Sequence, residues 1–145
     1  MEDLNGVPFC GASGKLLNEL LQIAGLRRGE VYVTNIVKCR PPGNRVPSED
    51  EIEICTSNFL RKQISIIRPK LVVTLGRTSV KALMGREFTM GLEHGNKLMC
   101  NYGGVSFELF VSYHPAASLY GAKAKSNLQK DFAKLAKILK SLKLP

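Results

Sequence analysis

The chain has 145 residues, which is enough to bury one hydrophobic core and too few for two domains, so we expect a single domain over residues 1–145. Its 21 Lys and Arg against 12 Asp and Glu favour a polyanionic partner such as nucleic acid, although a protein with merely solvated lysines would have the same totals. No apolar stretch is long enough for a membrane span, which excludes a membrane-spanning protein and predicts a cytoplasmic one. Its four cysteines are then thiols or metal ligands rather than disulfides.

The first element in chain order is a glycine-rich loop over residues 6–14, followed by a predicted helix over residues 15–24 that ends at Gly25. The apolar residues of this helix recur at the spacing of one buried face: Leu16, Leu17, Leu20, Leu21 and Ala24. Free N–H groups at its start suit an anion, although glycine turns alone are weak signals. No strand precedes the loop, so we expect a domain that lacks its N-terminal segment.

Residues 31–34, Val-Tyr-Val-Thr, are β-formers and predict a short buried strand. Asn35 then falls where that strand ends, and a basic, proline-rich loop follows with Lys38, Arg40 and Arg45. Ligands of open α/β sheets bind beyond the carboxyl ends of the strands. This stretch is therefore placed to meet a base or a phosphate.

Ser48 and Glu51 form a capping-box pattern that predicts the start of a helix running to Ile67, with Pro69 after it. We expect its inner face to carry Ile52, Cys55, Phe59 and Ile66. A second buried strand is predicted over residues 70–75, and Gly76 turns the chain into a short helix that ends near Gly85.

Residues 97–112 predict a hairpin around Gly103 and Gly104, whose second arm, residues 105–112, is the third core strand. This arm delivers His114 to the same sheet edge as Asn35. Ser126 and Gln129 predict the start of a final helix, whose apolar stripe consists of Leu128, Phe132, Leu135, Leu139 and Leu142.

Three loops thus converge with Phe9, Asn35 and His114. An aromatic ring, a carboxamide and an imidazole are what a pocket for a flipped pyrimidine requires, because they stack on the base, pair with its edge and bond an oxygen that gains charge. Taken singly, the three residues are equally well a core aromatic, a turn residue and a loop histidine.

Four segments, GVPFCGASGKLLNELL, VYVTNIVKCRPPGNRVPSEDEIEIC, RPKLVVTLG and SYHPA, resemble in order and spacing the iron-sulfur uracil-DNA glycosylases, most like family four. The resemblance covers essentially the whole chain. It implies a three-layer α/β/α sandwich with a short, mainly parallel central sheet whose first strand is missing here. It also implies hydrolysis of the N-glycosidic bond of uracil in DNA, which leaves an abasic site in base-excision repair.

The resemblance assigns roles by position. Phe9 is similar to the residue that stacks on uracil, and Asn35 to the one that recognises its edge. His114 is similar to the imidazole that stabilises the departing uracil anion through O2, and Glu2 to a pocket acid near the base. His94 receives no catalytic role.

Cys39 and Cys55 are the candidate metal ligands. The spacing of these two cysteines alone fits a pair of buried thiols or half a zinc site about as well as it fits an iron-sulfur site. The resemblance implies a 4Fe–4S cluster, for which Cys39 and Cys55 match two of the four cysteine ligands. Cys10 and Cys100 match no ligand position.

For DNA, the resemblance implies phosphate contacts from Lys38, Arg40 and Arg45, and a wedge at Leu119 or Tyr120 that fills the gap left by the flipped base. The implied partner is uracil-containing DNA, with no membrane, and we expect a monomer. No replication or repair partner is indicated by the sequence.

Before the point where this chain begins, the family has two further cluster cysteines, the central strand of its sheet and the loop that positions the attacking water. We therefore expect an N-terminally truncated glycosylase with weak cluster binding and weak activity. The alternatives are a non-catalytic nucleic-acid-binding α/β module and an inactive truncated glycosylase. A relative that traps its product through a histidine in an inserted loop fits less well, because no such insert follows Lys38.

Overall fold

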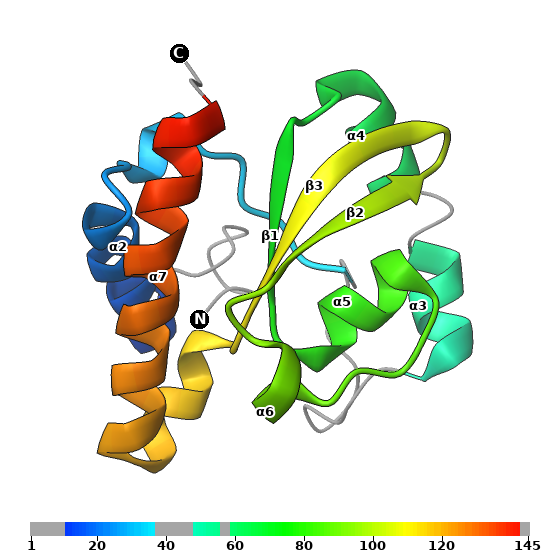
Figure 1. The fold of residues 1–145 in the computed structure, drawn as a ribbon. Helices are drawn as coiled ribbons and strands as arrows, with labels where there is room; N and C mark the ends of the chain where they lie inside the picture. Colours follow the sequence, from blue (N-terminus) through cyan, green and yellow to red (C-terminus); the bar gives the residue numbers. More distant parts are fainter. Residues whose placement is uncertain (1–10, 37–47, 56–58, 143–145) are drawn as a thin grey trace.

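The computed structural model describes residues 11–36, 48–55 and 59–142 (Figure 1). The helices are α2 (Ala12–Ile23), α3 (Glu49–Cys55), α4 (Arg61–Ile67), α5 (Arg77–Met84), α6 (Met90–Glu93) and α7 (Ala122–Leu142), with 3-10 turns η1 (Arg28–Glu30) and η4 (Pro115–Tyr120). The strands are β1 (Leu71–Leu75), β2 (Lys97–Tyr102) and β3 (Val105–Ser112).

The strands described here form one mixed sheet in the order β1-β3-β2. β1 runs parallel to β3, from Leu71 opposite Glu108 to Leu75 opposite Ser112, and β2 is antiparallel to β3. The hairpin turns at Gly103 and Gly104, both at positive φ, as two-residue turns between twisted strands require. A mainly parallel sheet was expected; within the described residues one pairing is parallel and one antiparallel, because the hairpin supplies the third strand.

Helices cover both faces of the sheet (Figure 1). On one face, α2 and α7 bury a cluster with Phe110, and on the other, α4 and α5 bury a cluster with Leu109 and Val111. Successive β3 side chains therefore enter opposite cores, and Leu109, Phe110 and Val111 are each fully buried. β3 is the strand on which both cores are built.

Several local predictions are confirmed. α2 buries Leu17, Leu20 and Leu21 as expected and ends before Gly25, whose φ is +82°, but it begins at Ala12 rather than at Lys15, and Leu16 is only partly buried. The capping box is formed, since Ser48 N–H donates to Glu51 Oε1 at 3.0 Å and Glu51 N–H donates to Ser48 Oγ at 3.2 Å. β1, α5, the hairpin and the stripe of α7 also lie where the sequence predicts them.

The strand predicted over residues 31–34 is wrong. The segment keeps the alternation of a strand, because Val31 and Val33 pack against the cluster of α2 and α7 while Ile36 packs against that of α4 and α5. It forms no ladder with the strands of the described residues. Tyr32 is 62% exposed and accepts a hydrogen bond from Gln63 Nε2 at 2.9 Å. Extended β-formers become a strand only when a neighbour offers its backbone groups for pairing.

Two helix predictions also need correction. Within the helix expected from Ser48 to Ile67, α3 and α4 are described, Ile64 of α4 and its N-cap Leu60 are buried, and Ile66 is 80% exposed. The expected inner face was therefore wrong for Phe59 and Ile66, both of which are exposed. α7 begins at Ala122 rather than near Ser126, because the Ala-Lys-Ala-Lys stretch has high helix propensity and adds a turn.

In the part of the chain that the structure describes, no helix combines the length and apolar character needed to cross a membrane.

Candidate active site

The carboxyl ends of the parallel pair β1 and β3 bring Gly76 and His114 together. Gly76 N–H donates to the Ser112 carbonyl at 2.9 Å, which continues the pairing one residue beyond β1. A Cβ on Gly76 would lie 3.2 Å from the Cβ of His114, and the φ of Gly76 is +97°. A side chain at position 76 would therefore be strained and would press on the histidine.

His114 is half-buried and forms the N-cap of η4. The Ala116 N–H donates to its Nδ1 at 3.0 Å, and the Ala117 N–H donates to its carbonyl oxygen at 2.9 Å. Because Nδ1 accepts a hydrogen bond, the neutral ring carries its proton on Nε2. The turn thus sets both the direction of the imidazole and its tautomer.

A shallow hollow of about 290 Å³ lies between the first turns of α2 and the η4 turn that follows His114. Its walls include Ser13 and Leu16 from α2, and Pro115 and Ser118 from η4. Leu119, also in the wall, is 68% exposed. The hollow is bordered by lysines from two helices, Lys15 and Lys125. The surface beside the histidine is thus concave, and two lysines and one glutamate, Glu19, line it.

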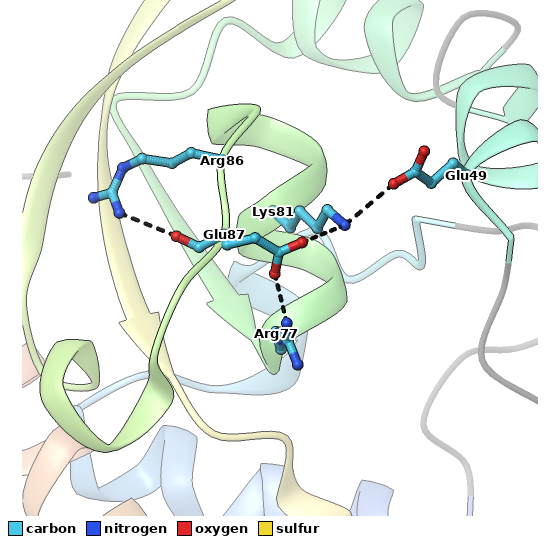
Figure 2. A network of polar contacts seen from close by, with 5 residues as sticks. All are labelled: Glu49, Arg77, Lys81, Arg86 and Glu87. Carbon is cyan, nitrogen blue, oxygen red and sulfur yellow. Dashed lines mark hydrogen bonds and ion pairs between the residues drawn. The ribbon is translucent and has the colours of Figure 1, made fainter.

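An ion-pair network adjoins the same edge of the sheet (Figure 2). Arg77, directly after Gly76, pairs with Glu87 at 2.5 Å, Lys81 pairs with Glu87 at 2.7 Å, and Lys81 also reaches Glu49 at 3.4 Å. Hydrogen bonds from Lys81 and then Arg77 lower the pKa of Glu87 from 4.5 to about 2, and Glu87 in turn raises the pKa of Lys81. These groups are exposed, so the network orients Arg77 more than it stabilises the fold.

Of the predicted site residues, the structure places His114 and Leu119 on the His114–Tyr120 turn. Asn35 is exposed in the extended segment 31–36, beside Ile36 of the α4 and α5 cluster. Cys55 ends α3 and Tyr120 ends η4. The remaining predicted residues lie outside the described part of the chain: Glu2, Phe9, Lys38, Cys39, Arg40 and Arg45.

For a metal centre, the described residues contain no group of three side chains that could hold an ion. Cys100 is buried, its thiol donates to the Leu83 carbonyl at 3.5 Å, and burial raises its pKa, so it is an inert core thiol. The described residues therefore do not by themselves fit an iron-sulfur cluster, and no chemical step below depends on one.

Sequence reasoning missed two features of this region. The contact of Gly76 with His114 depends on the strand register, although a glycine directly after a β-run was a usable signal. The buried Asp131, which bonds Ser112 and His94, stands among lysines in the sequence of α7 and carried no signal.

The fold is mixed α/β, and an imidazole is fixed beyond the carboxyl ends of its parallel strands. These features define the class: an α/β protein whose ligand site lies at that edge of the sheet. A sequence profile of the Uracil DNA glycosylase superfamily matches residues 1–143. The chain therefore belongs to the uracil DNA glycosylase superfamily.

Within that superfamily the similarity is to the type-4 enzymes. The chain is 45% identical over 142 residues to the type-4 uracil-DNA glycosylase of Sulfurisphaera tokodaii, covering 94% of this chain and 64% of that protein. It is 44% identical over 146 residues to the type-4 uracil-DNA glycosylase of Saccharolobus solfataricus, covering 97% of this chain and 67% of that protein. It is also 32% identical over 130 residues to a DNA polymerase of Bacillus phage SP01, covering 89% of this chain and 13% of that protein. The chain spans about two thirds of the length of its type-4 relatives.

Replacing Gly76 should disturb His114 specifically. Gly76→Ala and Gly85→Ala both put a side chain at a positive φ, at a cost of about 1–3 kcal/mol each, but a Cβ at position 85 would have nothing within 4 Å. We expect both variants to lose stability in urea unfolding and only Gly76→Ala to shift the ring ¹⁵N resonances of His114. Equal His114 spectra in the two variants would contradict the contact.

Glu87 should titrate far below an ordinary glutamate. Because its pKa is lowered from 4.5 to about 2, its pairing with Lys81 and Arg77 is complete above pH 4.5 and is lost as the pH falls towards 2. In an NMR titration the side-chain carboxyl carbon should have its midpoint near 2 in the wild type. The midpoint should rise in Lys81→Met and stay in place in Lys62→Met, an exposed control on α4. A wild-type midpoint near 4.5 would contradict the network.

Proposed function

We propose that this protein is a uracil-DNA glycosylase, which hydrolyses the bond between uracil and deoxyribose and leaves an abasic site for base-excision repair. Membership of the superfamily supports the proposal, as does the similarity to enzymes of that name. The observation that carries it is the Ala116 N–H bond to His114 Nδ1, because this bond puts a donor, Nε2–H, on the imidazole at the sheet edge.

The proposed chemistry follows from charge. As the glycosidic bond breaks, the sugar becomes cation-like and uracil becomes an anion. A hydrogen bond from a donor already aimed at O2 is therefore stronger in the transition state than in the bound substrate. His114 Nε2–H is that donor. One such preorganised donor contributes about 2.7–4 kcal/mol, or roughly 10²- to 10³-fold in rate. In this role His114 donates a hydrogen bond and keeps its proton.

We propose that three further residues surround the flipped base. Phe9 stacks on the flipped uracil, Asn35 pairs with its edge, and Glu2 lies near the base. The exposed position of Asn35 in the 31–36 segment allows contact with a base entering from solvent. A stacked ring and a paired amide bind the base, whereas His114 acts on the charge that develops.

For DNA, we propose that Lys38, Arg40 and Arg45 bind phosphates and that Leu119 or Tyr120 is the wedge. The support is that Leu119 is a large apolar side chain, 68% exposed, on the turn that begins at His114. An apolar side chain in that position can enter the space that a flipped base leaves. The substrate is uracil-containing DNA, which we propose the protein meets in the cytoplasm.

Cys39 and Cys55 are proposed to supply two thiolates to a 4Fe–4S cluster. The support is the similarity to type-4 enzymes together with the position of Cys55 at the end of α3. Such a cluster, when bound, would fix the proline-rich loop by covalent ligation, a structural role.

The test of the proposed function is release of uracil. Wild-type protein should produce alkali-labile sites in an oligonucleotide with one uracil and none in the matched thymine oligonucleotide. His114→Ala should lower the single-turnover rate about 10²- to 10³-fold while its affinity for the DNA changes little, because the lost hydrogen bond strengthens as charge develops on O2. Wild-type binding without strand breaks would favour a non-catalytic module, and a His114→Ala rate equal to wild type would remove His114 from catalysis.

The cluster has its own measurement. Anaerobically purified wild-type protein should contain iron and acid-labile sulfide at less than the amount of a full cluster, and Cys39→Ser or Cys55→Ser should lower both. Cys100→Ala is the control, because this buried thiol bonds Leu83 and should leave the iron content unchanged. Iron content that is independent of Cys39 and Cys55 would contradict their assignment.

A further inference from the structure

We propose that Asp131 is a positioning residue for His114, acting through Ser112 and through His94. The effect on rate rests on the proposed function, whereas the effect on the orientation of His114 does not. Asp131 lies on α7 and is 4% exposed, so its carboxylate is inside the protein.

Two donors converge on the carboxylate. Ser112, the fully buried last residue of β3, donates its hydroxyl to Asp131 Oδ2 at 3.1 Å. His94 Nδ1 lies 3.0 Å from both carboxylate oxygens, and since a carboxylate only accepts, Nδ1 is the donor. Asp131 therefore ties the end of β3 to the turn that follows α6.

This arrangement holds the three residues that precede His114. Val111 is held by its backbone, since Gly95 N–H donates to its carbonyl at 2.6 Å and its own N–H donates to the Asn96 carbonyl at 3.0 Å. The Ser112 side chain is held by Asp131. The Tyr113 ring lies against the His94 ring, with centroids 4.7 Å apart and planes tilted by 38°.

Gly95 shows that the chain is shaped around the carboxylate. Its φ is +80°, and a Cβ there would lie 2.9 Å from Asp131 Oδ1. Glycine at this position lets the 94–96 turn come close to the carboxylate. The turn can then bond both the Asp131 carboxylate and the backbone of β3.

A buried carboxylate is a poor way to gain stability, because desolvation offsets the attraction of its partners, and an apolar side chain fills such space at less cost. What it provides is a fixed geometry. An imidazole acting on a transition state tolerates little displacement, and a shift of about 1 Å can cost about 100-fold in rate. The bonds of Asp131 with Ser112 and His94 therefore serve to orient His114 rather than to stabilise the core.

The experiment compares Ser112→Ala with Thr74→Val. Both remove one buried hydroxyl near the end of a paired strand; that of Thr74, on β1, donates to the Phe110 carbonyl at 3.3 Å and lies outside the Asp131 network. We expect similar losses of melting temperature in the two variants. Only Ser112→Ala should lower the single-turnover rate, by about 10- to 100-fold, with half-saturating protein concentration unchanged.

His94→Phe supplies a second arm that depends less on the strand. It keeps a ring against Tyr113 and removes the donor to Asp131, so we expect a loss in rate of the same kind. Asp131→Asn offers one acceptor oxygen to two donors and should change the rate in the same direction.

The spectroscopic readout needs no activity. Hydrogen exchange of the Ala116 amide, which donates to His114 Nδ1, should become faster in Ser112→Ala and His94→Phe and stay unchanged in Thr74→Val. Rates and Ala116 exchange in both variants matching Thr74→Val would overturn the proposal. If Ser112→Ala does not fold, His94→Phe decides alone. An inactive wild type would refute the proposed function, and exchange at Ala116 would still decide the positioning.

Discussion

The parallel pairing of β1 with β3 is the constraint on which the site depends. Its register puts Leu75 opposite Ser112, so Gly76, one residue further on, and His114, two residues further on, meet beyond the sheet. β3 can keep that register because both of its faces are buried, with Phe110 in one core and Leu109 and Val111 in the other. A slip by one residue would exchange these faces. The position of the imidazole is therefore set by packing on both sides of one strand.

Much of the fold could be predicted because its signals are local. Glycines at Gly25, Gly76 and Gly103 end or turn elements at positive φ, and the Ser48–Glu51 pair caps a helix whatever the rest of the chain does. The failures concern partners. Residues 31–34 are extended as their composition requires, but composition cannot say whether a ladder forms. In α4 the buried face is set by contacts with the α5 cluster, and a seven-residue helix is too short for its periodicity to fix the face.

The candidate site shows the same division. His114 and Leu119 are site residues predicted from the sequence, and the structure places both on one turn. The tautomer of His114 follows from the Ala116 N–H, a backbone group without a sequence signature. Asp131 and His94 are 37 residues apart, and a single aspartate on a lysine-rich helix reads as solvent-facing. Residues that act through space on another side chain are the ones a linear reading misses.

Two adjacent side chains of α7 contact β3 in different ways. Phe132 packs in the core against Phe110 of β3, and Asp131 bonds Ser112, the last residue of that strand. Peeling of this helix from the sheet would uncouple both at once. Separation of α7 from the sheet by local unfolding would remove the Asp131 bond to Ser112 while the hairpin could stay paired. The geometry of the residues that precede His114 would then depend on how firmly α7 packs against the sheet.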